Sequence, residues 1–96
     1  MSTGNPNSEE IREQIFERDD YYCQHCGAYA LLPGKQIQLA HLVPNTKPMR
    51  SKYGKQVVDH PQNRVTTCSL ECNNAVQLTN KPVEADALAD EIRSVL

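Results

Sequence analysis

Four cysteines, arranged as two closely spaced pairs, constrain this chain more than any other feature of its sequence. Cys23 and Cys26 form the first pair, Cys68 and Cys72 form the second, and the 96 residues contain no other cysteine. Two such pairs on a small chain are typical of a tetrahedral zinc site, in which each thiolate lies about 2.3 Å from the ion. The spacing therefore predicts a structural zinc ion that ties two distant segments together.

Two disulfides in a secreted protein are the alternative explanation of four cysteines. The polar start of the chain has neither a charged segment nor an apolar stretch, so it does not look like a secretory signal peptide. No segment is apolar over a length that would cross a membrane. Closely paired cysteines without a secretory context favour a metal site, and together these features predict a cytoplasmic protein with no membrane partner.

A metal would matter for the folding of so small a chain. The sequence contains one Phe and no Trp, and its mean hydropathy is -0.62. A domain of this size buries too little apolar surface to be stable without additional cross-links such as a metal ion. Zinc binding to thiolates contributes folding free energy on the order of 10 kcal/mol. We therefore expect one zinc-stabilised domain over residues 1–96.

Positive charge is concentrated in the middle of the chain. The net charge of -2 argues by itself against a nucleic-acid partner. Residues 35–64 nevertheless carry a single acid, Asp59, whereas the other acids, apart from Glu71, lie in residues 9–20 and 84–91. The basic residues of this segment are Lys35, Lys47, Arg50, Lys52, Lys55 and Arg64. Such a distribution fits a cationic face that meets phosphates, and it fits an ordinary solvated loop equally well.

Hydrophobic periodicity predicts a helix near each end of the chain. Ile11, Ile15 and Phe16 share one face of a helix over residues 8–18. A second helix over residues 82–96 begins with a proline, which suits the first turn. Its apolar face consists of Ala85, Leu88, Ile92 and Val95.

Between these helices the sequence alternates between strand and loop signals. Alternating polar and apolar residues predict a half-buried strand over residues 36–43, and a second strand is expected over residues 64–67. The segment 45–56, rich in Lys, Pro and Gly, predicts a loop, and residues 57–58 are expected to form a short extended edge. A helix of about two turns is expected to begin at Asn73.

The order of these features resembles that of the HNH endonucleases, also called ββα-metal nucleases, in their zinc-stapled four-cysteine form. The resemblance covers about residues 10–78, and it is closest to the HNN variants of the family, which include phage junction-resolving endonucleases. It is carried by Arg18-Asp-Asp-Tyr-Tyr-Cys23-Gln-His-Cys26-Gly27, by Ala40-His41-Leu-Val-Pro44, by Asn63 and by Cys68-Ser-Leu-Glu-Cys72-Asn73.

The resemblance implies a small α+β fold. A zinc-stabilised ββα-metal motif, similar to a treble clef, is expected between an N-terminal and a C-terminal helix. The expected organisation is a disordered tail at 1–7, a helix at 8–18, a zinc-stapled core at 19–78 and a C-terminal helix at 82–96.

The same resemblance implies roles for individual residues. His41 would be the general base, Asn63 would bond the loop backbone and hold that histidine in orientation, and Asn73 would ligate a catalytic Mg²⁺ or Mn²⁺. The concentration of positive charge in the central segment, and not the resemblance, predicts DNA contacts by Lys47, Arg50, Lys52, Lys55 and Arg64. These roles describe a metal-dependent endonuclease that hydrolyses phosphodiester bonds in DNA and needs no small-molecule cofactor.

This chemistry is coherent on physical grounds. A neutral imidazole can accept the proton of an attacking water near neutral pH. A divalent cation can act as a Lewis acid on the phosphate and on the leaving oxygen, and Mg²⁺ suits an oxygen site with few protein ligands. The zinc ion would be structural only, because four thiolates close its coordination shell.

One position departs from the family pattern. Most members have Asp just before the general base and use its carboxylate as the principal metal ligand, whereas this chain has Ala40. Asp59 or His60 could take over as ligand, although His60 is explained equally well as part of a turn. Alternatively, the catalytic metal has been lost and only nucleic-acid binding remains.

Three hypotheses follow from these features. The first is a metal-dependent endonuclease, and the second is a catalytically inactive, zinc-stabilised nucleic-acid-binding domain derived from the same fold. The third is a protein-interaction module that uses the acidic helices at the two ends. Cutting both DNA strands in one encounter would need two copies of so small a domain, which is consistent with a homodimer, but no residue pattern specifies one.

Overall fold

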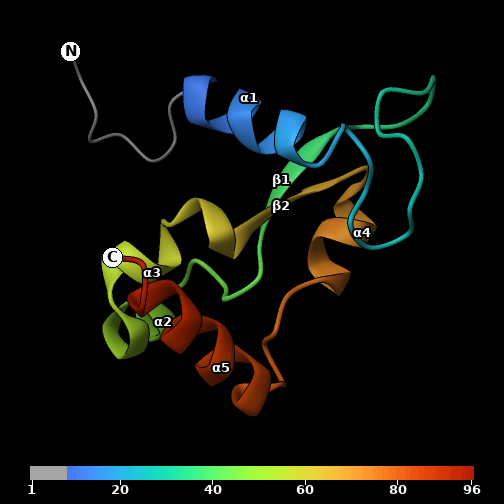
Figure 1. The fold of residues 1–96 in the computed structure, drawn as a ribbon. Helices are drawn as coiled ribbons and strands as arrows, with labels where there is room; N and C mark the ends of the chain where they lie inside the picture. Colours follow the sequence, from blue (N-terminus) through green and yellow to red (C-terminus); the bar gives the residue numbers. More distant parts are fainter. Residues whose placement is uncertain (1–8) are drawn as a thin grey trace.

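A two-stranded antiparallel sheet lies at the centre of the fold, with helices on both sides of it (Figure 1). The computed structural model describes residues 9–96, so the expected tail and the first residue of the expected N-terminal helix lie outside the described residues. The elements are α1 (Glu9–Arg18), β1 (Gln38–His41), α2 (Lys47–Tyr53), α3 (Lys55–Val58), the short 3-10 helix η1 (Pro61–Asn63), β2 (Arg64–Thr67), α4 (Leu70–Ala75) and α5 (Pro82–Arg93). This arrangement confirms the expected small α+β class.

The pairing of the two strands decides which residues meet at each end of the sheet. Gln38 lies opposite Thr67, and His41 lies opposite Arg64. Cys68 follows directly after β2, so the cysteines gather at the Gln38 end. α1 packs against β2, and α4 packs against both strands. The candidate zinc centre and His41 therefore occupy opposite ends of the same short sheet.

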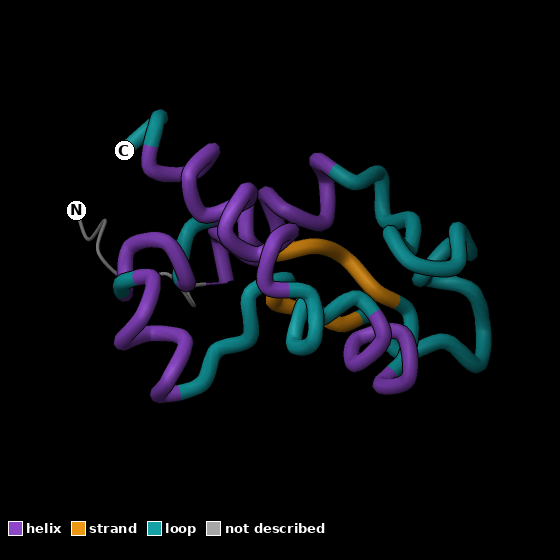
Figure 2. Tube along the Cα trace, turned by 90° about the horizontal axis from the view of Figure 1, so that it is seen from below, coloured by secondary structure: helices purple, strands orange, loops and turns teal. Residues whose placement is uncertain are grey.

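The buried side chains form two separate clusters. The larger lies among α2, α3 and α5, on the side of the sheet where the chain ends (Figures 1 and 2). It consists of Val43, Tyr53, Val57, Val58, Ala85, Ala89 and Ile92. The smaller consists of Cys23, Ala30, Cys68 and Cys72. Three of its four members are cysteines, and Ala28 and Ile37 pack against it. Ile15 and Phe16 of α1 are buried outside both clusters.

The segment expected as a loop and a short extended edge is helical instead. It forms α2 and α3, which are joined at Gly54. The hydroxyl of Thr46 caps α2 by accepting a hydrogen bond from the N–H of Met49 at 3.4 Å, and a proline stands in the first turn. Val57 and Val58 pack with Tyr53 into the larger cluster. Burial against α5 thus stabilises two helices too short to be stable alone.

The other boundaries also differ in detail from the expectation. β1 spans four residues, shorter than the predicted strand. α4 begins before Asn73, because the Ser69 hydroxyl accepts a hydrogen bond from the N–H of Cys72 at 3.1 Å and caps the helix there. In α5, Ala89 is buried with the predicted apolar face, whereas Val95 lies beyond the helix and is exposed. No helix within residues 9–96 is both long enough and apolar enough to span a membrane.

Candidate functional site

The four cysteine sulfurs form one compact group whose dimensions fit a zinc ion. All four Sγ atoms lie within 4.8 Å of one another, with Cys26 and Cys68 3.5 Å apart and Cys68 and Cys72 4.0 Å apart. A regular ZnS₄ tetrahedron with bonds of about 2.3 Å has sulfur–sulfur edges of about 3.8 Å. A disulfide would need about 2.05 Å, and all four cysteines are free thiols. The donor set therefore suits structural zinc, and the disulfide alternative does not describe this fold.

The first cysteine pair is held in a tight turn. The N–H of Cys26 donates to the sulfur of Cys23 at 3.5 Å, and the N–H of Gly27 donates to the carbonyl of Cys23 at 2.9 Å. Gly27 has φ +81°, a conformation in which a side chain would be strained. His25, between the two ligands, is exposed. The backbone freedom of glycine therefore allows the turn to close around the first cysteine pair.

The protonation of the thiols explains why a cation belongs here. Burial raises the pKa of Cys23, but the backbone N–H groups of Cys26 and His25 outweigh it and bring that pKa down to about 6. Burial, together with the neighbouring thiols, raises the pKa of Cys68 to about 12. Burial and the neighbouring thiols thus oppose ionisation of Cys68 beside a Cys23 thiol that ionises readily. A Zn²⁺ ion would supply the positive charge that lets all of them bind as thiolates.

Backbone hydrogen bonds connect the cysteine centre to the sheet. The N–H of Gln24 donates to the carbonyl of Thr66 at 2.9 Å, and the N–H of Gln36 donates to the carbonyl of Cys68 at 3.0 Å. The first bond joins the first cysteine pair to β2, and the second joins the segment just before β1 to Cys68, which follows β2. The cysteine centre is therefore connected directly to the strand that begins at Arg64.

At the other end of the sheet, His41 is half-buried among charged groups. Burial lowers the pKa of its imidazole, the positive charges of Arg64 and Arg50 lower it further, and the carboxylate of Asp59 acts in the opposite direction. The net effect is a pKa below the ordinary 6.5. The imidazole is consequently neutral at pH 7 and able to accept a proton.

Asn63 makes the contact that the resemblance implies for it. It is completely buried, and its Oδ1 accepts a hydrogen bond from the N–H of Val43 at 2.7 Å. Its Nδ2 donates to the carbonyls of Val43 at 3.0 Å and Val58 at 2.9 Å, while its backbone carbonyl accepts from the N–H of Leu42 at 2.8 Å. The two residues directly after His41 are thus held by one residue, Leu42 by the backbone carbonyl of Asn63 and Val43 by its side-chain amide.

Asp59 lies near His41 but is engaged with Arg50. Arg50 Nη1 donates to Asp59 Oδ1 at 2.9 Å, and Nη2 donates to Oδ2 at 3.3 Å. Both carboxylate oxygens therefore already accept from one guanidinium.

His60 serves as the cap of η1. Its Nδ1 accepts a hydrogen bond from the N–H of Gln62 at 3.1 Å, and the helix continues from Pro61. This contact bears out the turn interpretation of the histidine. It also occupies Nδ1, so only the second ring nitrogen, Nε2, would remain to bind a metal ion.

Asn73 is engaged at the other end of the sheet. Its Nδ2 donates to Gln38 Oε1 at 2.9 Å, and Gln38 is the first residue of β1, whereas His41 is the last. Successive strand side chains point to opposite faces, so Gln38 and His41 project on different sides. Within residues 9–96, only the four cysteines bring three or more His, Cys, Asp or Glu side chains close enough to share an ion.

The five basic residues assigned to nucleic-acid contact are in different environments. Lys47, Lys52 and Lys55 are exposed on α2 and α3. Lys52 also lies 3.9 Å from a carboxylate oxygen of Asp86. Arg64, by contrast, is 1% exposed. It lies beside His41 in the sheet and is not part of an exposed basic surface.

Two residues that fasten this site together were assigned no such role from the sequence. Arg18 donates from Nη1 to the carbonyl of Pro61 at 3.0 Å and from Nη2 to that of Arg64 at 2.7 Å. Asp19 Oδ2 accepts from the N–H of Thr66 at 2.9 Å. Burial alone would raise the pKa of Asp19, but Arg18 and the Thr66 N–H lower it. In the sequence they stand out only as part of the segment from Arg18 to Gly27 that carries the resemblance.

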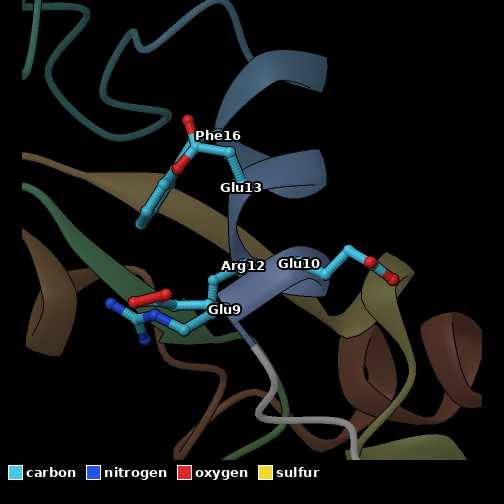
Figure 3. A pocket seen from close by; sticks show the side chains of 5 residues that line it. All are labelled: Glu9, Glu10, Arg12, Glu13 and Phe16. Carbon is cyan, nitrogen blue, oxygen red and sulfur yellow. The ribbon is translucent and has the colours of Figure 1, made fainter. Parts of the chain in front are cut away.

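A hollow on the surface of α1 lies apart from these residues. It is lined by side chains of α1 alone, none of which belongs to the cysteine centre or to the His41 site (Figure 3). The lining residues are Glu9, Glu10, Arg12, Glu13 and Phe16.

Comparisons with known protein families, with curated proteins and with solved structures found no match for this chain.

Proposed function

We propose that this protein is an HNH-type endonuclease that hydrolyses phosphodiester bonds in DNA, with His41 as the general base. The observation that supports this most is the amide of Asn63, which fastens the backbone of Val43 directly after the His41 segment. A buried asparagine used in this way restricts where the end of β1, and with it the imidazole, can move. Such restriction is what a general base needs, because proton transfer depends on position.

The charges around His41 suit the reaction. A water molecule attacks phosphorus while the neutral imidazole takes one of its protons. The bond from phosphorus to the 3′ oxygen breaks, and the leaving oxygen gains a proton from solvent. Arg50 and Arg64 both act electrostatically on His41. Their positive charges would offset the negative charge that develops on the phosphate.

A catalytic Mg²⁺ or Mn²⁺, which the resemblance implies, has no ready donor set at this end of the sheet. Ala40 has no ligand atom, Asp59 accepts from Arg50, and Asn73 is bonded to Gln38. Asp59 could ligate the ion only after releasing Arg50, and His60 could offer only Nε2, because its Nδ1 accepts from the N–H of Gln62. No step is therefore assigned to this ion.

The second candidate is a zinc-stabilised domain that binds nucleic acid without cutting it. The Arg50–Asp59 ion pair favours it, because that pair occupies the carboxylate that would have to replace the missing ligand at Ala40. On this alternative His41 and Asn63 keep only structural roles.

Plasmid cleavage by zinc-loaded protein tests both candidates. Wild type, His41→Ala and the exposed-histidine control His25→Ala are compared with Mg²⁺, with Mn²⁺ and with no added divalent cation. We expect nicking or linearisation by wild type and by the control, and its loss in His41→Ala. Absence of cleavage by wild type under every condition, with retained gel-shift binding, would replace the endonuclease by the binding domain.

A further inference from the structure

We infer that Arg50, held in place by Asp59 and Asn45, is the group that binds a phosphodiester beside His41, and that Asp59 positions this arginine instead of ligating a divalent cation. The inference rests on the proposed function in one respect, namely that the ligand is a nucleic-acid backbone. It gives a different role to the carboxylate that the sequence suggested as a metal ligand.

The guanidinium of Arg50 is fixed from two directions. Asp59, which follows directly after α3, receives one hydrogen bond on each carboxylate oxygen, at 2.9 and 3.3 Å. Asn45 Oδ1 receives a further hydrogen bond from Nη1 at 2.9 Å. A side chain with several rotatable bonds is thereby held in one orientation. Less conformational entropy remains to be lost when a ligand binds.

The donors that Arg50 has left form a second fork. A guanidinium carries five N–H groups in a rigid plane, and Asp59 and Asn45 take three of them. Within the described part of the chain, the Nε N–H and the remaining Nη2 N–H have no recorded partner. These two N–H groups point along the same edge of the plane. That edge matches two oxygens of a phosphate.

Of the two arginines whose charges act on His41, Arg50 is the one that a ligand can reach. Its side chain is 32% exposed, whereas that of Asp59 is 15% exposed. The other guanidinium beside His41, that of Arg64, is 1% exposed. A phosphate approaching His41 would therefore meet Arg50 first, with Arg64 adding positive potential from inside.

A divalent cation at Asp59 would face two obstacles. It would have to displace a guanidinium that already satisfies both carboxylate oxygens, and it would be repelled by the positive charges of Arg50 and Arg64. The positive charge that a metal would bring to the phosphate is already supplied by arginine. Phosphodiester binding by this site is consequently expected to be independent of added Mg²⁺.

Fluorescence anisotropy with a labelled short DNA duplex tests the role of Arg50. Zinc-loaded protein is titrated at matched ionic strength, with and without Mg²⁺. We expect the same affinity under both conditions and a loss of about tenfold in Arg50→Ala, because a charge-assisted bidentate contact is removed. Arg50→Lys keeps the charge without the fork, and its affinity should lie between those of wild type and Arg50→Ala.

The charge-matched control is Lys35→Ala. Lys35 lies near the opposite end of β1, so this variant should keep most of the affinity. An unchanged affinity in Arg50→Ala would overturn the inference.

Whether Asp59→Asn raises or lowers the affinity for DNA tests whether Asp59 positions Arg50. Removing a negative charge would strengthen phosphate binding if the carboxylate acted only by repulsion. If it positions Arg50, the affinity should instead fall several-fold, and the control Asp20→Asn should show no such fall. Tighter binding by Asp59→Asn would contradict a positioning role. Zinc content and thermal unfolding verify that each variant is folded, and Arg50→Lys carries the test if Arg50→Ala does not fold.

Binding of Mn²⁺ to the zinc-loaded protein tests the alternative role directly. We expect electron paramagnetic resonance to detect no stoichiometric Mn²⁺ site. One bound Mn²⁺ per chain that disappears in Asp59→Asn and persists in Asp20→Asn would identify Asp59 as a ligand and refute the inference. Neither measurement depends on cleavage. Failure of the nuclease proposal would appear as uncut plasmid with the Arg50 effect intact, whereas failure of this inference would leave cleavage by His41 in place.

Discussion

Asn63 and Val43 are joined by a pair of reciprocal hydrogen bonds, in which the Val43 N–H donates to the asparagine side chain and the Val43 carbonyl accepts from it. The two residues are twenty positions apart in sequence, and both are fully buried. This pair of hydrogen bonds joins the segment just after β1 to the residue just before β2. Because both residues are buried, water does not compete for these bonds, and the end of the strand that carries His41 is held in place.

Replacing Asn63 should therefore cost stability as well as activity. Asn63→Ala leaves the Val43 N–H and the carbonyls of Val43 and Val58 without this partner inside the protein. Each buried polar group left unsatisfied costs about 1–3 kcal/mol, so we expect a loss of about 3 kcal/mol or more in the free energy of unfolding, measured with urea. The exposed control Asn74→Ala should change it by less than about 0.5 kcal/mol. An Asn63→Ala variant as stable as wild type would show that the amide does not hold the loop.

Loss of the metal should unfold the cysteine half first. Three of the four residues in the smaller buried cluster are cysteines, so little apolar burial remains there without zinc. We expect one Zn²⁺ per chain by mass spectrometry, and chelation should accelerate amide hydrogen exchange around the cysteines more than in α5. Cys68→Ser should reproduce this pattern, and the control His25→Ala should retain zinc. Uniform exchange along the chain after chelation would contradict two separate cores.

The contribution of the Ser69 cap of α4 to the stability of the protein should be measurable separately from that of zinc. Ser69→Ala removes the hydroxyl that accepts from the Cys72 N–H, and loss of such a cap costs about 1 kcal/mol. The same change at the exposed Ser51, inside α2, has no cap to remove and should be neutral or slightly stabilising. Thermal unfolding of zinc-loaded protein compares the two variants. Equal melting temperatures would show that zinc binding alone fixes the start of this helix.

The pKa of His41 should follow its charged neighbours in a predictable direction. Asp59 raises this pKa and Arg50 lowers it, so Asp59→Asn should move it further down and Arg50→Ala should move it up. Titration of the imidazole signals by NMR measures both shifts. Shifts of the same sign in the two variants would mean that the charges do not act on His41 as the geometry implies.

The same lowered pKa sets the pH dependence of stability and of activity. Because folded His41 binds its proton less tightly than the unfolded chain does, its contribution to stability is present above the ordinary pKa of 6.5 and is lost as pH falls through the lowered value. If His41 is the base, kcat/KM should decline on the acidic side at a pH below that same 6.5. A decline that begins above it would point to another group.

Much of the chemistry was visible in the sequence because it depends on residue type and on short spacings. The two cysteine pairs bring their own ligand geometry, so a four-thiolate centre followed directly from the positions of Cys23, Cys26, Cys68 and Cys72. The helical face of Ile15 and Phe16 and the strand before Cys68 were likewise local patterns, and they occur as expected. The contact of Asn63 with the loop backbone was implied by the resemblance and is present.

Only the tertiary structure decided which partners these residues have. α2 and α3, of seven and four residues, are too short for local preference to specify them, and burial against α5 makes them helical. The sequence suggested Asp59 and Asn73 as metal ligands. In the fold, the packing of α2 and α3 pairs Asp59 with Arg50, and α4 places Asn73 beside Gln38. The sequence by itself determined the donor set of the zinc centre and the identity of the candidate base. The fold determined the charges around that base, because ion pairs and buried hydrogen bonds join residues that no short spacing relates.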